Sequence, residues 1–381
     1  MNAEIVIVGA GISGTAIAWN LAKSGMKGIV VVDRGDLTNG STGRCGAGVR
    51  EQWATRTNCL LAQKSIEFYE HAAEILGYPG DIEFKQEGYL ILACTEAEVV
   101  QFAKNVELQH SFGIPSRWVD PAGAKAIVPH LNEKAIYGAT FCPKDGHLNP
   151  FATNDAFFRA AKALGVTFLQ NETVTGIRVE NGRIASVETD KRIIATPRVV
   201  DAAGGYAADV ASLAGIDLPV IPERHEILVT EPVERMQGPM VMSFSQNLYC
   251  QQSPHGSFLM GRGDPDAPRN HDLGSGWRFL DEMAKTVKKY LPAVAELRVV
   301  RQWAGSYAMS PDRQPILGAV PQVEGFYAAC GFSGHGFMFA PMTGLLLSEV
   351  ILGKTPSLDM SELGIGRFQK EAPIEVEKSV V

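Results

Sequence analysis

The chain has 381 residues, of which 45% are hydrophobic and 20% are charged, and its formal net charge is -7. This length and balance predict a globular protein of two domains and exclude a disordered chain. No cluster of Lys or Arg accompanies aromatic residues, so no nucleic-acid partner is expected. The N-terminal residues lack the basic start and cleavage site of a signal peptide, which favours a cytoplasmic location.

The cysteines indicate reduced thiols rather than disulfides or a metal site. Their wide spacing contains no CxxC pair and no Cys/His pattern typical of a zinc site. No metal is therefore expected at these residues, which are Cys45, Cys59, Cys94, Cys142, Cys250 and Cys330.

One apolar stretch, residues 336–353, resembles a membrane span in composition. It is short for that role, contains Pro341 and Gly344, and carries Glu349. We therefore expect a buried helix and no membrane span.

The N-terminal segment predicts one complete βαβ unit. Residues 4–9 form a continuous apolar, β-branched run, the pattern of a parallel strand buried on both faces. Residues 13–24 predict a helix, which Gly25 ends. Residues 28–32 predict a second strand, which ends at Asp33.

Two later segments, residues 199–204 and 325–331, predict further strands of the same layer, and a helix over residues 340–352 follows the second. Short β-rich segments bounded by Gly, Pro or polar turns lie between these pieces. They predict an antiparallel sheet over residues 84–93, 136–142, 225–230, 248–252 and 258–261.

These elements predict an α/β protein, α+β overall, in which a Rossmann-like domain carries an inserted antiparallel-sheet domain. Both domains are expected to be discontinuous in sequence. The Rossmann-like domain covers residues 1–80, 144–216 and 322–370, the inserted substrate domain covers residues 81–143 and 217–321, and residues 371–381 form a flexible charged tail.

The turn between the first strand and the first helix has the GxGxxG pattern of a dinucleotide site. Its glycines let the backbone approach a pyrophosphate, which the helix N-terminus stabilises. Asp33 follows where such sites place an acid that accepts hydrogen bonds from a ribose. Dinucleotide binding is therefore predicted, although the pattern does not separate NAD from FAD. The expected cofactor contacts are Gly9, Gly11, Ile12, Ser13, Gly14, Asp33 and Arg34.

A second glycine-rich segment, residues 40–50, lies too close to the first to serve another nucleotide. Such a loop is suited to wrap a flavin, so it favours FAD over NAD. The contacts expected from it are Ser41, Thr42, Arg44, Cys45, Gly46, Ala47 and Gly48.

The chain resembles the D-amino-acid-oxidase-like FAD oxidoreductases, which include sarcosine oxidases, glycine oxidase and the β subunits of dye-linked L-proline dehydrogenases. The resemblance covers nearly the whole chain and rests on the N-terminal unit, residues 41–53, WAGSYAMSPD at 303–312 and GFSGHGFM at 331–338. The last segment is most similar to the sarcosine oxidase and proline dehydrogenase β-subunit branch. The resemblance implies non-covalent FAD, with further contacts from Val174, Ala203, Gly204, Gly331, Ser333, Gly334, His335, Gly336, Phe337 and Met338.

The resemblance also identifies two residues for the substrate carboxylate. Arg50 matches the arginine that binds it in monomeric sarcosine oxidases, and a guanidinium can hold a carboxylate through two hydrogen bonds. The alternative is a structural ion pair with a neighbour such as Glu51. Tyr307 stands where glycine oxidase has a carboxylate-binding arginine and sarcosine oxidases have tyrosine. It is expected to close over the substrate or donate a hydrogen bond, with packing on the flavin as the alternative.

Three more residues are candidates for the active site. His335 lies within the flavin segment and is expected to contact the flavin. His225 is a candidate to accept the amine proton or tune the pocket, with an ordinary structural role as the alternative. Tyr249 is a weaker candidate, for which core packing is the alternative.

Several positions depart from the family pattern. Gly305 replaces the cysteine that holds flavin covalently in monomeric sarcosine oxidases. Leu259 and Met338 stand near the lysines of those oxidases, and the lost positive charge predicts slow reaction of reduced flavin with oxygen. Asn154 replaces a histidine that holds FMN in heterotetrameric relatives, which leaves open a non-covalent FMN at a subunit interface.

The predicted function is oxidation of a small amino or imino acid, such as proline, sarcosine or glycine, by hydride transfer to FAD to give an imine. The electrons are expected to pass to a partner subunit, a quinone or a dye. One alternative is an oxidase that releases hydrogen peroxide, and another is a non-catalytic flavin-binding subunit of an electron-transfer complex. An NAD-dependent dehydrogenase is disfavoured, because no second nicotinamide signature is present.

Overall fold

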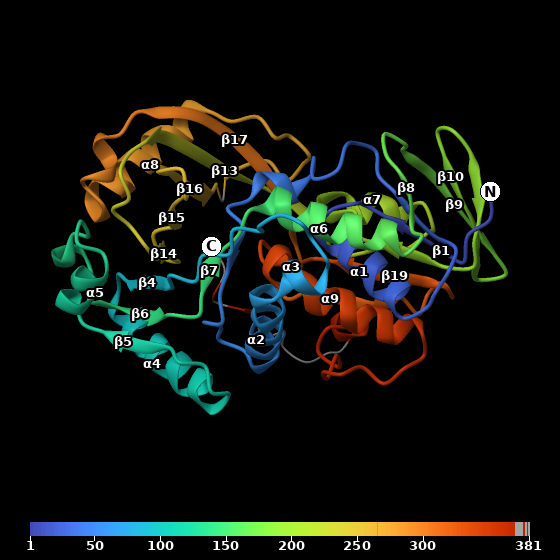
Figure 1. Ribbon diagram of the computed structural model, residues 1–381, viewed down its shortest axis with the longest axis horizontal. Coiled ribbons are helices and arrows are strands. Elements are labelled where there is room, and N and C mark those ends of the chain that lie inside the picture. Colours follow the sequence, from blue (N-terminus) through green and yellow to red (C-terminus); the bar gives the residue numbers. More distant parts are fainter. Residues whose placement is uncertain (265, 370–375, 378, 380–381) are drawn as a thin grey trace.

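The computed structural model describes residues 1–264, 266–369, 376–377 and 379. Two large sheets lie side by side along the longest axis of the molecule (Figure 1). The eight-stranded sheet occupies the left half of that view, and the six-stranded sheet with its helices occupies the right half.

The six-stranded sheet has the order β18-β19-β12-β1-β2-β8. Strand β1 runs parallel to both β2 and β12, and every residue of β1 and β2 is buried. A strand covered on both faces needs a continuous apolar run, which explains the pattern in the sequence. The strands are β1 (Ile5–Val8), β2 (Ile29–Val32), β8 (Thr167–Leu169), β12 (Val199–Asp201), β18 (Ile316–Ala319) and β19 (Phe326–Cys330).

Several helices pack around this sheet. Helix α1 (Ile12–Lys23) packs against α6 (Pro150–Ala163) and α9 (Gly336–Ile351), and α9 also contacts α2 (Arg56–Glu70). Gly344 allows α1 and α9 to approach, because a Cβ there would lie 2.7 Å from the Ala16 carbonyl oxygen. The shorter helical segments of this half are η1 (Ser41–Arg44), α3 (Ala72–Ile75), η3 (Gly204–Tyr206), α7 (Ala207–Ser212) and η5 (Ile365–Gln369).

Helix α9 contains Pro341 in its interior. A proline leaves the carbonyl four residues earlier without its helical donor. That carbonyl belongs to Phe337, and Tyr69 Oη of α2 donates a 2.7 Å hydrogen bond to it. The helix begins at Gly336, in agreement with the buried helix expected from the apolar stretch at residues 336–353. The narrower range of 340–352, predicted after the last strand, begins four residues too late.

The eight-stranded sheet has the order β17-β13-β16-β15-β14-β4-β6-β5. Strand β14 pairs with β4 in parallel, so the sheet is not wholly antiparallel as predicted. The two strands come from different inserted segments, so no hairpin turn sets their relative direction. The strands are β4 (Tyr89–Ala93), β5 (Arg117–Val119), β6 (Gly138–Cys142), β13 (Ile221–Pro232), β14 (Met240–Ser243), β15 (Leu248–Gln252), β16 (Ser257–Gly263) and β17 (Val299–Met309).

The remaining elements complete the two halves. Helices α4 (Glu96–Ser111), α5 (Pro121–Ile127) and α8 (Trp277–Tyr290), with η2 (Glu133–Ala135) and η4 (Val294–Glu296), accompany the eight-stranded sheet. A small sheet is formed by β9 (Val174–Glu180), β10 (Arg183–Thr189) and β11 (Ile193–Ala195), and β3 (Gly48–Val49) pairs with β7 (Gly146–His147).

The predicted fold class and the N-terminal βαβ unit are confirmed, but one domain boundary is wrong. Strand β18 pairs with β19 in the six-stranded sheet, although residues 217–321 were predicted to belong to the inserted domain. The predicted tail mostly lies outside the described residues. Glu377 and Ser379 are described and buried, so the prediction is wrong for these two residues.

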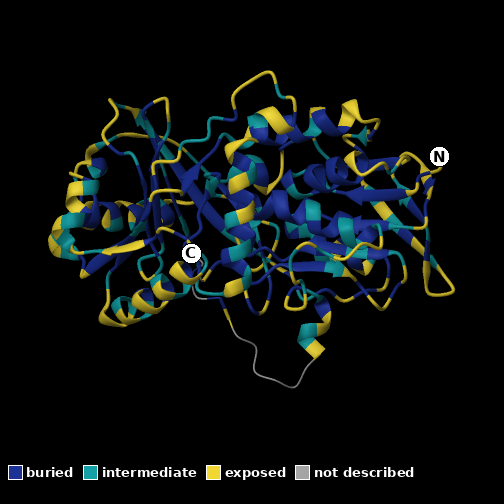
Figure 2. Ribbon diagram, turned by 60° about the horizontal axis from the view of Figure 1, so that its bottom comes forward, coloured by how far each residue is buried: buried dark blue, intermediate teal, exposed yellow. Residues whose placement is uncertain are grey.

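Buried segments run through the middle of both halves, while exposed segments lie on outer helices and loops (Figure 2). The largest apolar cluster joins β1, α1, α2 and α9. Within the described residues, no helix combines the length and apolar character needed to span a bilayer.

Candidate functional site

A cavity of about 730 Å³ extends between the two halves of the molecule. Its walls come from the β1–α1 turn, the end of β2, residues 38–50, the segment after β12 and the start of α9. Strands β4, β13, β14, β15 and β17 supply the opposite wall. The cavity volume lies in the range of cofactor and ligand sites in proteins.

All five candidate active-site residues line this cavity: Arg50, His225, Tyr249, Tyr307 and His335. The predicted cofactor contacts also line it, with the exceptions of Gly14 and Gly331. These two glycines lie behind the wall. A Cβ on Gly14 would overlap the carbonyl oxygen of Gly9, so Gly14 is needed for packing between the turn and α1.

The glycine turn at residues 9–14 is held open toward the cavity. Gly9 has a φ of 109°, which favours glycine, and a Cβ there would overlap the Ala202 carbonyl. Asp33 accepts hydrogen bonds from Ala10 N at 2.7 Å and from Gly35 N at 2.8 Å. The carboxylate therefore fixes the glycine turn to the end of β2 and remains on the cavity wall.

Asn154 holds the same turn from behind. Its Nδ2 donates to the Ala10 carbonyl and to Thr38 Oγ1, each at 3.1 Å. Its Oδ1 accepts a 2.7 Å hydrogen bond from Thr15 Oγ1. In the sequence Asn154 stands out only because it replaces a histidine that holds FMN in relatives, and no motif marks its role in holding the turn.

The glycine-rich loop after β2 is anchored from the eight-stranded sheet. Gln251 Nε2 donates to the Gly46 carbonyl at 2.8 Å, and Trp303 Nε1 donates to the Arg44 carbonyl at 3.1 Å. Ala47 has a φ of 50°, a left-handed conformation that a residue with a Cβ adopts at an energetic cost. These contacts hold a strained loop in place along the cavity.

Tyr307 and His225 form a stacked pair in the wall. Their ring centres lie 3.6 Å apart at an interplanar angle of 12°. His225 Nε2 lies 3.2 Å from Glu223 Oε1, and Nδ1 is buried with no partner among the described residues. Gly334 makes room for the pair, because a Cβ there would overlap the Tyr307 ring.

His335 directly precedes α9 and lies beside Trp53. Their ring centres lie 4.8 Å apart. Burial, and then the positive charge of Arg50, lowers the pKa of His335 to about 3. The imidazole is therefore neutral at physiological pH, and neither ring nitrogen has a partner within the described part of the chain.

Arg50 is only 3% exposed and still lines the cavity. Its guanidinium lies 3.7 Å from the centre of the Trp53 ring and donates to the carbonyls of Gln52 and Ser379. Burial lowers the pKa of Arg50, and the nearby Glu377 carboxylate opposes that shift. The alternative, an ion pair with Glu51, is not seen: both side chains are described, and neither carboxylate oxygen of Glu51 has a partner among the described residues.

Part of the wall near Arg50 consists of residues that the sequence does not single out. Tyr89, Ile227, Met240 and Met242 line the cavity with Tyr249. The first four of these residues lie on strands β4, β13 and β14. The register of these strands decides which of their side chains face the cavity. Burial raises the pKa of both Tyr89 and Tyr249, so both phenols are protonated donors. No motif marks these residues.

A buried carboxyl supports the segment that carries Arg50. Asp145 accepts hydrogen bonds from Glu51 N and Gln52 Nε2, both at 2.7 Å. Burial raises the pKa of Asp145 from 3.8 to about 7. Burial likewise raises the pKa of Glu51 from 4.5 to about 7.

The raised pKa values of Asp145 and Glu51 contribute a fall in stability as the pH rises from about 4 to about 7, whereas the lowered pKa of His335 contributes a rise over much of this range. In this range each carboxyl is protonated in the folded chain and ionised in the unfolded chain, so folding takes up a proton. One such group contributes about 1.4 kcal/mol per pH unit. Asp145→Asn should therefore remove the share of Asp145, so the urea midpoint of the variant relative to the unmodified chain should rise with pH across this range.

The matched control is Asp217→Asn, which changes an exposed carboxyl. Its profile should follow that of the unmodified chain. An Asp145→Asn profile as steep as that of the control would contradict the assignment of a protonated Asp145.

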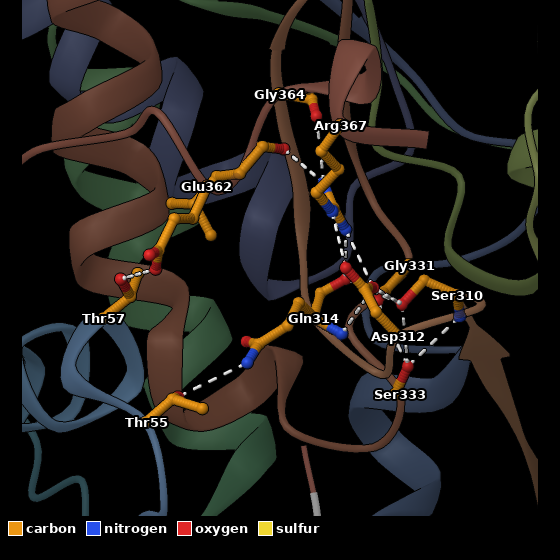
Figure 3. Close-up of polar contacts among 11 residues, drawn as sticks. Thr55, Thr57, Ser310, Asp312, Gln314, Gly331, Ser333, Glu362, Gly364 and Arg367 are labelled. Atoms are coloured by element: carbon orange, nitrogen blue, oxygen red, sulfur yellow. Dashed lines mark hydrogen bonds and ion pairs between the residues drawn. The ribbon is translucent and has the colours of Figure 1, made fainter. Parts of the chain in front are cut away.

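A polar network fixes residues 331–335, which precede α9 (Figure 3). Arg367 binds Asp312 through two hydrogen bonds of 2.6 and 3.0 Å. Ser310 Oγ lies 3.2 Å from Asp312 Oδ1, and Ser310 N donates to Ser333 Oγ. Ser333 has a φ of 48°, so this network holds another strained residue on the cavity wall.

The residues present fit FAD. The glycine turn exposes backbone N–H groups at a helix start, as a pyrophosphate requires. The wall continues past this turn along residues 40–50 and reaches His225, Tyr307 and His335. The cavity is therefore longer than an ADP moiety alone would need, which leaves room for a flavin ring. Fold and site together define a flavin-dependent oxidoreductase.

Comparisons with known proteins identify the family. Residues 4–350 match the family DAO, FAD dependent oxidoreductase, and the chain belongs to it. The chain is 36% identical to the L-proline dehydrogenase structure from P. horikoshii, over 98% of this chain and 99% of that one, with a TM-score of 0.92.

Curated relatives extend the same similarity. The chain is 29% identical to the sarcosine oxidase subunit beta of Rhodobacter capsulatus, over 96% of this chain and 89% of the relative. It is 28% identical to the mitochondrial sarcosine dehydrogenase of Mus musculus over 96% of this chain, but it spans only 41% of that protein.

Proposed function

We propose that the chain oxidises a small primary or secondary amino acid, with FAD accepting a hydride from the carbon next to nitrogen. The observation that carries the proposal is a buried arginine, Arg50, beside tyrosines at one end of the cavity. The acidic side chains on the described cavity wall are Asp33, Glu172 and Asp209, which belong to the nucleotide half of the molecule. The Arg50 end is therefore suited to a carboxylate.

The relatives support a substrate with a secondary amine. Sarcosine and L-proline, which give two relatives their names, are both secondary amino acids. The apolar residues Ile227, Met240 and Met242 beside Tyr89 leave an environment that suits a small aliphatic substituent.

Each side chain has a separate task in this proposal. FAD, when bound, supplies the two-electron acceptor. Arg50 holds the carboxylate and so orients the C–H bond. Tyr249 and Tyr307 are protonated, because burial raises the pKa of each, and they donate hydrogen bonds. If His225 Nε2 donates to Glu223, its unpartnered Nδ1 is an acceptor suited to the amine proton.

We also propose that oxygen is not the main electron acceptor. Met338 lines the cavity where related oxidases carry a lysine, so it brings no positive charge to the flavin. Leu259, at the second such position, lies on β16. The chain would then be a dehydrogenase that passes electrons to a partner subunit, a quinone or a dye. The alternative is an oxidase that forms hydrogen peroxide.

We also propose that the chain binds a partner subunit and is located in the cytoplasm. The name of the Rhodobacter relative, a beta subunit, supports a partner subunit, and a second flavin, FMN, at their interface is part of this hypothesis. All six cysteines are free thiols, which fits a reducing compartment such as the cytoplasm.

The test is an anaerobic screen of the purified chain with its FAD. L-Proline, sarcosine, glycine and N-alkyl amino acids are added singly, and loss of the oxidised-flavin absorbance is followed. Bleaching by at least one of them is expected, and slow recovery on admission of oxygen would support the dehydrogenase. A chain that keeps its yellow colour with every amino acid would instead be a non-catalytic flavin subunit.

A further inference from the structure

A stack of three side chains joins the two halves of the molecule at the nucleotide end of the cavity. The guanidinium carbon of Arg34, directly after β2, lies 3.6 Å from the centre of the Tyr206 ring in η3. The ring of His271, from the loop between β16 and α8, lies 3.9 Å from the same centre at an interplanar angle of 12°. Two groups this close to one ring occupy its two faces, so Tyr206 lies between them.

The loop that carries His271 is attached on both sides of the cavity. His271 Nε2 lies 2.8 Å from Asp209 Oδ2 on α7, which belongs to the nucleotide half. The next residue, Asp272, pairs with Arg224 of β13 at 3.1 Å. Gly276 N donates a 3.0 Å hydrogen bond to Glu226 Oε1 on the same strand. The segment therefore bridges β13 and α7.

The stacked side chains are part of the cavity wall. Arg34, Tyr206 and His271 line it together with Leu273 and with Asp33, the predicted ribose acceptor. His271 Nδ1 is buried and has no hydrogen-bond partner among the described residues. A buried polar atom of this kind costs free energy unless a bound group satisfies it.

We propose that residues 271–276 form a strap from the inserted domain that closes over the ADP half of FAD. His271 and Leu273 contact the nucleotide from this side, and the stack on Tyr206 with the Asp209 pair holds the strap shut. FAD release then requires the strap to open, so both domains retain the cofactor. The proposal rests on FAD binding alone and does not depend on which amine is oxidised.

The test compares FAD release from the holoprotein and from its His271→Ala variant, without any substrate. Removal of the stacked ring and its contact with Asp209 is expected to speed FAD dissociation about tenfold, equivalent to about 1.4 kcal/mol. The rate is followed as the rise of free-flavin fluorescence after dilution. His255→Ala changes an exposed histidine between β15 and β16 and should leave the rate unchanged.

Ligand binding to the apoprotein shows which half of FAD the strap contacts. ADP should bind the His271→Ala apoprotein about tenfold more weakly, whereas the affinity for FMN, which lacks the ADP half, should not change. Asp209→Ala removes only the acceptor that faces His271 Nε2, so it should speed FAD release by a smaller factor. This variant is the test if His271→Ala does not fold. FAD release at the unmodified rate in both variants, or equal losses for ADP and FMN, would overturn the proposal.

Discussion

Arg50→Ala is expected to weaken the binding of amino acid substrates about 100-fold and to leave the FAD affinity within about twofold. The guanidinium is buried beside Trp53, so a substrate carboxylate in the variant would lose a charge-assisted partner with little water to replace it. The measurement is an anaerobic titration in which flavin bleaching is followed against amino acid concentration.

The control is a substrate pair that differs in charge, L-proline and L-prolinamide. The unmodified chain should prefer the acid, and Arg50→Ala should lose that preference. Arg50 also donates to the carbonyls of Gln52 and Ser379, so a structural role is the competing explanation. That role would be supported by equal losses for acid, amide and FAD, and the carboxylate assignment would then be wrong.

Much of the nucleotide half could be predicted because its rules are local. A buried parallel strand must be apolar throughout, and the turn that follows must contain glycine where the backbone approaches a phosphate. Both signals lie within residues 4–33, and the βαβ unit they predict is present. The start of α9 was given both as residue 336 and as residue 340, and the hydrogen bond from Tyr69 that supports its first turn comes from a residue far away in sequence.

The substrate end was predictable only where a family motif marks it. Arg50, Tyr307 and His335 stand in such motifs, and the fold brings them to one cavity. Tyr89 and Met242 have no motif, and they reach the cavity because β4 and β14 pair in one particular register. That register is set by contacts between two segments far apart in sequence, which no local pattern encodes.

The strap residues illustrate the same limit for the cofactor. His271 lies in an irregular loop, and its two partners, Tyr206 and Asp209, come from the other half of the molecule. Single histidines and tyrosines in loops have no periodicity that would link them. Their association follows from the way the two sheets face each other across the cavity.

Gly14→Ala is expected to abolish FAD binding by destabilising the nucleotide half itself. The added Cβ would overlap the Gly9 carbonyl, which is backbone and cannot rotate away, so the start of α1 must separate from the turn. We expect a colourless protein with a lower urea midpoint for the apoprotein, a loss of about 2 kcal/mol or more. Gly366→Ala is the control, because nothing lies within 4 Å of its Cβ position.

Gly11→Ala tests whether the turn needs glycine for close approach of the cofactor as well as for packing against α1. Gly11 lines the cavity, and its added Cβ would lie 3.1 Å from the side-chain oxygen Thr42 Oγ1. Because that side chain can adjust, the apoprotein should keep its urea midpoint while FAD affinity falls about 30-fold through loss of close approach to the pyrophosphate. If Gly11→Ala destabilised the apoprotein as much as Gly14→Ala, both glycines would serve packing alone, and the turn would not be the pyrophosphate site.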